Sequence, residues 1–351
     1  MKQMNPVITI FLLLLLIFLH QARGQETTAR FLLLQPSARS AAMGGVGPSL
    51  ADDPFAGYYN PAALVFGPRI GLTGSFVKPV PFFGNTIHSY LTAIYVLNPS
   101  NAIGISTNLY HRSRQIIDYY DYFGDVSKLE KGSVTSWQGK FSYAHLMGEN
   151  VALGMSASIL RLNLVDQNEL IGSSAKNPTS WVLDIGMLAR DILPSATLTD
   201  NPGTAEGSFI ASLGSHREGK GLTVGFTMAN IGTNVSQIDP AQSDAIPSLL
   251  WLGGSYAPVS TQPVGVLVAV VFEKQLQESS TIDYVHLGGE LTLMRLLSFR
   301  GGYFADTYGP KNSYGTFGFG LDIKFFHFNI ARYNSTIEPT WHFDTTVSTE
   351  F

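Results

Sequence analysis

Apolar and polar side chains alternate one by one at the end of the chain. The last eleven residues, WHFDTTVSTEF, place Trp341, Phe343, Thr345, Val347, Thr349 and Phe351 on one side and His342, Asp344, Thr346, Ser348 and Glu350 on the other. The segments TFGFGLDIKF (316–325) and LTVGFTMA (222–229) repeat this alternation. A period of two is the repeat of a β-strand with one apolar face. Because nothing comparable supports helices after residue 68, the pattern predicts an all-β fold.

Fifteen segments of strand length follow one another from residue 70 to the end. They are 70–78, 87–97, 102–110, 136–146, 151–163, 180–189, 208–215, 222–230, 249–257, 264–273, 283–293, 297–305, 314–325, 326–333 and 341–351. Most have about the nine to eleven residues that cross a bilayer when tilted. Bacterial single-chain barrels have even strand numbers, so one segment is not a full strand. The order of short turns places the error at 180–189 or 208–215 and predicts about 14 antiparallel strands.

Composition favours a membrane environment. Charged residues make up 14% of the chain, against about 25% in ordinary soluble domains, and aromatic residues make up 12%. The longest apolar run after the N-terminus, 264–272, is too short to span as a helix. A helical membrane protein is therefore excluded, and a transmembrane β-barrel fits. The net charge of −4 gives no reason to expect nucleic-acid binding, and without cysteine there is neither a disulfide nor a lipid-anchored cysteine.

A soluble barrel is the alternative interpretation of the same period. It would place Lys and Glu on its outer face, whereas the polar positions here are mostly Gly, Ser and Thr and the charges gather in the connections. A closing strand that ends in an aromatic residue, Phe351, looks like the assembly signal of outer-membrane barrels. We therefore expect an integral protein of a Gram-negative outer membrane.

The N-terminus has the three parts of a secretory signal peptide. Lys2 is followed by an apolar run at 7–19 and by small residues at Ala22 and Gly24. A retained membrane helix is the weaker alternative, because the run is shorter than the roughly 20 residues that cross the hydrocarbon. The predicted division is a signal peptide at 1–24, a hatch or plug at 25–68 and a transmembrane β-barrel at 69–351.

Residues 25–68 predict short helices rather than strands. PSARSAAMGG (36–45) indicates a helix with Pro36 near its start and Gly44 or Gly45 at its C-cap. Asp52 or Asp53 is the expected N-cap of a second helix, and the chain breaks again at Asn60 and Pro61. Fourteen strands leave a lumen too wide for wall side chains to fill. We expect this segment to close the periplasmic mouth of the barrel.

The segment FLLLQPSARSAAMGGVGPSLADDPFAGYYNPAAL (31–64) resembles the N-terminal hatch of the PorV/PorQ family, which is related to the FadL group of fatty-acid channels. Further pieces agree with PorV/PorQ: NIG (230–232), IPSLLWLGGSYAPV (246–259), RGGYF (300–304) and the closing strand. The resemblance implies a fourteen-stranded barrel with a hatch motif at Gly44, Gly45, Asp52, Asp53, Asn60, Pro61 and Ala62. Residues 190–220 form a longer segment than the family pattern requires.

The same resemblance implies a component of the type IX secretion system. Its partners would be a large translocon barrel and the C-terminal domains of secreted cargo, contacted through outward loops at about 111–135, 164–179 and 231–247. The first loop carries Tyr119, Tyr120, Tyr122 and Phe123 between acidic residues. Tyrosines are favoured at protein interfaces, but also in the aromatic belt at the membrane surface, so both interpretations stay open.

A FadL-like channel for hydrophobic solutes such as long-chain fatty acids is the alternative function, with a lipid-like molecule in the lumen. In 151–164 the apolar phase changes near Ile159, which either a β-bulge or emergence from the membrane would explain. No nucleophile motif indicates an enzyme, and no cofactor is implied. Asp52 and Asp53 lack the spaced oxygen ligands of a calcium site, so no metal is expected.

Overall fold

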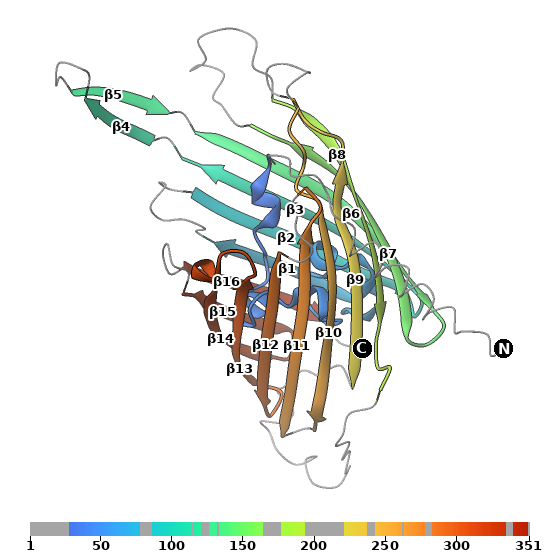
Figure 1. Cartoon of the computed structure of the whole chain (residues 1–351). Coiled ribbons are helices and arrows are strands. Elements are labelled where there is room, and N and C mark those ends of the chain that lie inside the picture. Colours follow the sequence, from blue (N-terminus) through green and yellow to red (C-terminus); the bar gives the residue numbers. More distant parts are fainter. Residues whose placement is uncertain are drawn as a thin grey trace.

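Fourteen antiparallel strands close into a barrel around a plug formed by the first part of the chain (Figure 1). The computed structural model describes residues 28–77, 86–113, 115–120, 126–131, 133–163, 177–193, 221–236, 243–261, 263–277, 283–334 and 340–349. The barrel strands are β1 (Ile70–Val77), β2 (Thr86–Asn98), β3 (Asn101–Arg112), β6 (Val134–Met147), β7 (Val151–Arg161), β8 (Thr179–Ala189), β9 (Leu222–Gly232), β10 (Leu249–Ser260), β11 (Val264–Gln275), β12 (Tyr284–Leu293), β13 (Leu297–Asp306), β14 (Tyr314–Ile323), β15 (Phe326–Tyr333) and β16 (Thr340–Thr349). Within these ranges no helix is long and apolar enough to cross a membrane.

The predicted strand number is confirmed. Segment 180–189 is the barrel strand β8, which pairs with β7 on one side and with β9 on the other. Segment 208–215, the rival strand, lies outside the described residues, as do the predicted signal peptide at 1–24 and Phe351. β1 pairs with β16 from Ile70 opposite Thr349 to Val77 opposite His342, and this seam closes the cylinder.

The two ends of the barrel differ in their connections. At one end five connections have two or three residues, 99–100, 148–150, 261–263, 294–296 and 324–325, and only the connection 190–221 is long. Ile70 and Thr349 also lie at this short-turn end. The opposite, long-loop end carries the loops at 113–133, 162–178 and 233–248. Outer-membrane barrels have short periplasmic turns and longer extracellular loops, so the short-turn end faces the periplasm.

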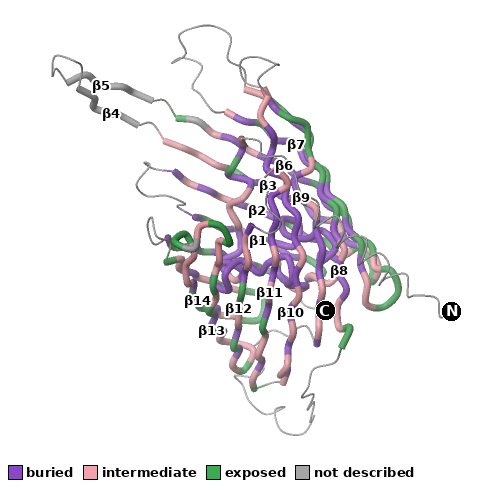
Figure 2. The backbone as a smooth tube through the Cα atoms, viewed as in Figure 1, coloured by how far each residue is buried: buried purple, intermediate pink, exposed green. Residues whose placement is uncertain are grey.

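Residues along the strands alternate between exposed and buried positions (Figure 2). The large exposed side chains are apolar. Along β16, Trp341 and Phe343 are 43% and 47% exposed, whereas His342 and Asp344 are 0% and 6% exposed. Hydrocarbon offers no partner to backbone N–H and C=O groups, and each unpaired group costs several kcal/mol. Closure pairs the backbone of every strand with both of its neighbours, so the polar side chains can turn inward.

The plug consists of five short helical turns within the lumen. They are η1 (Arg30–Leu33), α2 (Ala38–Ala42), η2 (Gly47–Ser49), α3 (Ala56–Tyr59) and η3 (Pro61–Phe66). Thr28 N donates to Ala245 O between β9 and β10 at the long-loop end, whereas η3 leads into β1 at the short-turn end. The plug therefore runs along the lumen from one end to the other. The prediction of a lumen hatch is confirmed, but its restriction to the periplasmic mouth is wrong, because residues 28–35 reach the long-loop end.

The expected helix caps are partly right. Ser37 Oγ accepts from Ser40 N at the start of α2, and Gly44 and Gly45 follow the C-cap Met43 with φ of 76° and 100°. The N-cap prediction for Asp52 or Asp53 is wrong, because α3 starts after Phe55 and no side chain caps it. Asp53 instead accepts from the N–H of Phe55 at 2.8 Å and from Ser37 Oγ at 2.8 Å, which ties two plug segments together.

Aromatic side chains join α3 to the wall. Tyr58 lies edge-on to Tyr59 at 4.9 Å and to Tyr90 of β2 at 5.8 Å between ring centroids. The Tyr58 hydroxyl donates to Leu32 O at 2.8 Å, and Tyr59 lies 6.4 Å from Trp251 of β10. Buried tyrosines need such partners for their hydroxyl groups. Burial raises the pKa of both plug tyrosines well above their usual range, so their hydroxyls stay protonated as donors.

A β-bulge does not cause the change in apolar alternation that was expected in 151–164. β7 pairs with β6 and β8 without a shift in register through Ile159. Leu160 and Leu162 are fully buried because they face the lumen and pack against Phe31 and Leu32 of the plug. The inward apolar residues at the end of 151–163 therefore mark contact with the plug.

A bulge does occur in β9. Leu183 pairs with Ile231 but Ile185 pairs with Met228, so Ala229 and Asn230 together oppose Asp184. Asn230 has a φ of 59°, and its N–H donates to Asp184 Oδ1 at 2.8 Å. Lys140 Nζ lies 2.5 Å from Asp184 Oδ2. This buried pair satisfies the carboxylate beside the interrupted ladder.

An arginine introduced at a lipid-facing position tests which face of the strands is the outer face. Leu183 is 51% exposed near the middle of β8, and Met147 is 52% exposed at the end of β6. We expect Leu183→Arg to lower the free energy of unfolding in lipid vesicles by about 2–4 kcal/mol, and Met147→Arg by about 0–1 kcal/mol, because the cost of a charge falls toward the interface. Urea titration followed by the gel mobility of unheated samples measures both. Equal losses would contradict this assignment of the outer face.

Candidate functional site

The plug sits against glycines of the barrel wall at two places. At the first, which we call the NPA seat, Asn60, Pro61 and Ala62 lie against Gly154 of β7, Gly186 of β8 and Gly225 of β9, where a Cβ would overlap the plug or crowd its atoms. Asn60 Nδ2 donates to Met187 O at 3.0 Å and to Phe226 O at 3.4 Å. Asn60 Oδ1 accepts from Ala62 N at 3.1 Å and caps η3. The side-chain amide of Asn60 thus both binds the wall and caps a helix of the plug.

The second contact, the α2 seat, lies between the end of α2 and β12–β14. Gly288, Gly302 and Gly318 are the wall glycines, and a Cβ on any of them would overlap Ala42 or Met43. His286 Nδ1 lies 2.7 Å from the carbonyl oxygen of Gly44 and donates to it. Thr316 Oγ1 donates to Ala42 O at 2.9 Å. The plug is therefore fixed to two separate parts of the wall by close backbone approach.

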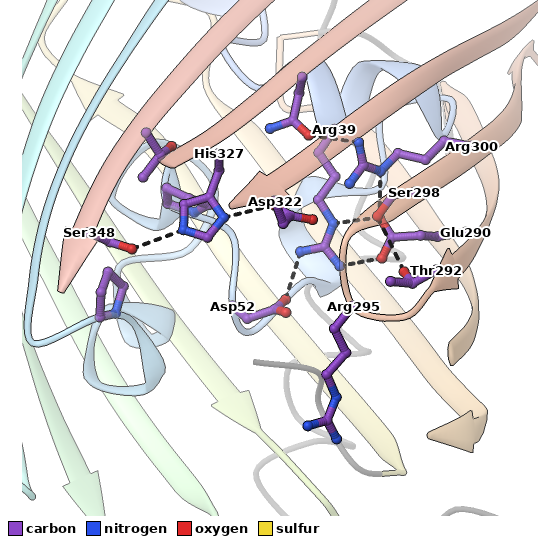
Figure 3. Close-up of a pocket in the computed structure, with 14 residues that line it drawn as sticks. Arg39, Asp52, Glu290, Thr292, Arg295, Ser298, Arg300, Asp322, His327 and Ser348 are labelled. Carbon is purple, nitrogen blue, oxygen red and sulfur yellow. Dashed lines mark hydrogen bonds and ion pairs between the residues drawn. The ribbon is translucent and has the colours of Figure 1, made fainter. Parts of the chain in front are cut away.

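An ion-pair cluster, the Arg39 latch, adds a third attachment (Figure 3). Arg39 of α2 bonds to Asp52 Oδ1 at 3.0 Å and to both carboxylate oxygens of Glu290 at 2.7 and 2.9 Å. Arg300 Nε donates to Glu290 Oε2 at 2.5 Å, and its Nη1 donates to Asn329 at 2.7 Å. Burial acts to lower the pKa of Arg39, but the charges of Asp52 and Glu290 raise it well above its usual range. Both guanidinium groups thus share one buried carboxylate, which holds α2 to the wall.

A polar network continues from the latch to the start of α2. Asn329 Nδ2 donates to Asp344 Oδ1 at 2.7 Å, and Ala38 N donates to Asp344 Oδ2 at 2.6 Å. Ala38 N is one of the first N–H groups of a helix, which have no partner within the helix itself. The carboxylate of Asp344 supplies the missing acceptor. Removal of the plug would take this hydrogen bond away from Asp344.

Two cavities lie on either side of α2. The outer chamber, at the long-loop end, has a volume of about 270 Å³ and is lined by Arg30, Leu33, Leu34, Gln35, Ala41, Gly44, Gly45, Glu273, Gln275, Tyr284, Phe304, Tyr314, Thr316 and Tyr333. The inner pocket, at the short-turn end, has a volume of about 80 Å³ and is lined by polar residues that include Arg39, Asp52, Glu290, Arg295, Arg300, Asp322 and His327 (Figure 3). Ala41 faces one cavity and Arg39 the other, so α2 and its latch separate them.

The outer chamber has an aromatic wall. The ring centroids of Tyr284 and Phe304 are 5.0 Å apart, those of Phe304 and Tyr314 are 4.8 Å apart, and those of Tyr314 and Tyr333 are 6.2 Å apart. We call these four rings the aromatic ladder. They come from β12, β13, β14 and β15 in order. Phe304 and Tyr314 are cross-strand partners, whereas Tyr284 and Tyr333 lie diagonally to them. The ladder offers aromatic rings beside the polar Glu273 and Gln275, and three of its four rings carry a hydroxyl group.

The structure brings the predicted hatch residues together in the lumen but gives them different tasks. Asn60, Pro61 and Ala62 form the NPA seat, and Gly44 and Gly45 meet β12 and β13. Asp52 pairs with Arg39, and Asp53 is buried within the plug, where burial raises its pKa. Within the described part of the chain, no group of three or more His, Cys, Asp or Glu could hold a metal ion.

The predicted partner-binding loop is described only in part. Tyr119 and Tyr120 lie on β4 (Gln115–Tyr120), which pairs with β5 (Val126–Lys131) in a separate two-stranded sheet beyond the barrel (Figure 1). Tyr122 and Phe123 lie outside the described residues. The Arg39 latch and the aromatic ladder were missed, although Glu290 and Arg300 in mid-strand, each between lipid-facing neighbours, are a signal that could have found the latch.

A closed fourteen-stranded barrel with an apolar exterior and a plug made by its own leading residues is an integral outer-membrane barrel of the FadL-like fold. Among solved structures it is similar to the Pseudomonas putida toluene transporter TodX (12% identity, 95% of this chain and 100% of that one, TM-score 0.53). It is likewise similar to the Ralstonia pickettii toluene transporter TbuX (13%, 90% and 98%, 0.53) and to the monoaromatic hydrocarbon channel CymD (13%, 93% and 98%, 0.53).

Identities this low show the fold alone. No protein-family model matches the chain, and no curated protein matches it in sequence. The likenesses therefore show the fold of a plugged fourteen-stranded outer-membrane barrel, and they do not separate the PorV/PorQ family from other proteins of this fold.

Two adjacent glycines of β13 test the α2 seat. A Cβ on Gly302 would overlap Met43 and Gly44, whereas a Cβ on Gly301 meets only Thr316 O at 4.0 Å. We expect Gly302→Ala to lower the free energy of unfolding by about 1–3 kcal/mol, because extra volume in a packed contact forces the backbone to shift. Gly301→Ala should stay within about 0.5 kcal/mol of the native barrel. Urea titration in vesicles measures both, and an unaffected Gly302→Ala would contradict the close seat.

Proposed function

We propose that this protein is an outer-membrane channel that takes a small hydrophobic solute from the outer face into the chamber beside α2. The proposal rests on one observation: an aromatic chamber at the long-loop end and a polar pocket at the short-turn end meet at the same five-residue helix. The fold supports it, because the solved structures of this fold named above are toluene transporters and a monoaromatic hydrocarbon channel.

The size of the chamber agrees with a small ring-shaped solute. Its volume is about 270 Å³, and an apolar cavity of roughly 150 Å³ is enough to hold benzene. The aromatic ladder would provide the offset-stacked and edge-to-face contacts that aromatic rings prefer. A long-chain fatty acid would need a longer cavity, so a compact solute fits this chamber better.

The route onward passes α2. The NPA seat and the α2 seat hold the plug by backbone contacts, whereas the Arg39 latch consists of side-chain ion pairs. Side chains change rotamers far faster than packed backbones rearrange. Opening of the latch would join the outer chamber to the inner pocket while both seats remain in place. Passage would therefore depend on Arg39 and Glu290 rather than on release of the whole plug.

Blocking the chamber tests this route. Thr316 lines the chamber, and its neighbour Gly315 has no atom within 4 Å of its Cβ position and pairs with the outward residue Tyr303. We expect Thr316→Trp to reduce uptake of radiolabelled toluene by proteoliposomes at least about tenfold, since an indole would occupy the chamber. Gly315→Trp adds the same side chain on the opposite face and should leave uptake unchanged. Equal uptake by the two variants would contradict the route.

A second candidate is a role in the type IX secretion system, favoured by the sheet of β4 and β5 that projects beyond the barrel wall (Figure 1). A projecting hairpin with tyrosines could dock a translocon barrel or the C-terminal domain of cargo, since tyrosine supplies contact area at low entropic cost. The candidate loop residues are Tyr119, Tyr120, Tyr122 and Phe123.

Affinity purification from detergent-solubilised outer membranes, followed by mass spectrometry, tests this second role. We expect the triple change of Tyr119, Tyr120 and Tyr122 to Ser to lose any co-purified translocon or cargo while the barrel still assembles. The control is Tyr303→Ser, because Tyr303 is exposed on the lipid-facing wall. Recovery of the same partners by the triple variant would remove this loop from the interaction.

A further inference from the structure

Glu273 places a carboxylate at the edge of the outer chamber. It lies on the inner face of β11 and is only 7% exposed. Glu273 Oε2 accepts from Trp251 Nε1 at 2.8 Å and lies 3.3 Å from His286 Nε2. His286 is itself fixed by its bond to Gly44 of the plug. One oxygen of the carboxylate is thus held by the wall, and the group as a whole lines the chamber.

The chamber has polar side chains beside Glu273 and aromatic rings along the ladder. Gln275, next along the inner face of β11, is 6% exposed and lines the chamber, as does Gln35 of the plug. The aromatic ladder continues the same wall from β12 to β15 and begins with Tyr284, the cross-strand partner of Glu273. A plain hydrocarbon would cover the rings but would offer the carboxylate no donor beyond Trp251 Nε1. A ring that carries a donor would satisfy both sides at once.

We propose that the outer chamber is selective for flat-ring solutes that carry a hydroxyl group, and that Glu273 accepts a hydrogen bond from this hydroxyl. The inference rests on the proposed function, since it names the solute class of the same chamber. The ring lies on the aromatic ladder, and the hydroxyl points toward β11. Sites built to bond a hydroxyl reject the analogue that lacks it, because the buried polar group is then left unpaired.

The negative charge of Glu273 narrows the class of ligand further. An anionic ring would meet the carboxylate of Glu273 at the position where a hydroxyl would bind, and like charges at that distance repel. Arg30 of η1 also lines the chamber, but its side chain is exposed and belongs to the outer rim. The inferred ligand is therefore a neutral phenol or ring alcohol rather than an aromatic acid.

Phenol and toluene differ only by a hydroxyl in place of a methyl group, so they form a matched pair of probes. We expect the full barrel in lipid nanodiscs to bind 4-fluorophenol at least about tenfold more tightly than 4-fluorotoluene, measured by fluorine NMR against empty nanodiscs. Equal affinities, tighter binding of 4-fluorobenzoate than of 4-fluorophenol, or no binding of any ring would each overturn the inference.

Glu273→Gln tests the acceptor directly. Trp251 Nε1 would retain the amide oxygen, which turns the NH₂ group toward the chamber and sets a donor against the donor of the ligand. We expect the preference for 4-fluorophenol to fall below about threefold while the affinity for 4-fluorotoluene is retained. Glu149→Gln, in the exposed short turn at 148–150, is the matched control and should change neither affinity. An unchanged preference in Glu273→Gln would overturn the role of Glu273.

This experiment separates the inference from the proposed function, because it measures binding without transport. Hydroxyl-selective binding by a barrel that moves no solute into proteoliposomes would leave the inference standing and remove the channel. Uptake of toluene with no preference for the hydroxyl would leave the channel standing and remove the inference. Gel mobility of unheated samples confirms that each variant is folded before either measurement.

Discussion

Backbone pairing in hydrocarbon is the constraint from which the rest of this structure follows. Every N–H and C=O group at membrane depth needs a partner within the protein, so the sheet must close on itself. Closure is made by the seam of β1 and β16, whose eight residue pairs run from Ile70 to Val77. A cylinder of fourteen strands has a lumen too wide for its own wall side chains. The plug fills that lumen.

The plug fits closely against the wall because the wall has glycines, which carry no side chain, at the contacts. Wall glycines at the two seats let the plug backbone approach more closely than any side chain would allow. Polar groups at the plug surface then find wall partners, as when Asp344 accepts from the first turn of α2 and Asn60 bridges two strands. Close packing makes the seats rigid, whereas the ion pairs of the Arg39 latch are the part that can rearrange.

The same geometry separates the lumen into two chemically different compartments. Strands β12–β15 bring aromatic residues together at the long-loop end, and their short-turn ends bring Arg295, Arg300, Asp322 and His327 to the inner pocket. A solute that leaves the aromatic side for the polar side must pass α2. In the proposed channel, movement would be local to this wall, because the opposite wall, with its β9 bulge and Lys140–Asp184 pair, is fixed by buried bonds.

The sequence by itself determined the barrel, because a period of two acts on each strand separately: Trp341, Phe343 and Val347 face outward for the same local reason that His342 faces inward. It also located the plug and its Asn60–Pro61 break. Only the tertiary structure decided how far the plug reaches, why Leu160 and Leu162 face inward, and which residues form the latch and the ladder. Arg39 and Glu290 are 251 residues apart, and their contact depends on closure, which no local pattern encodes.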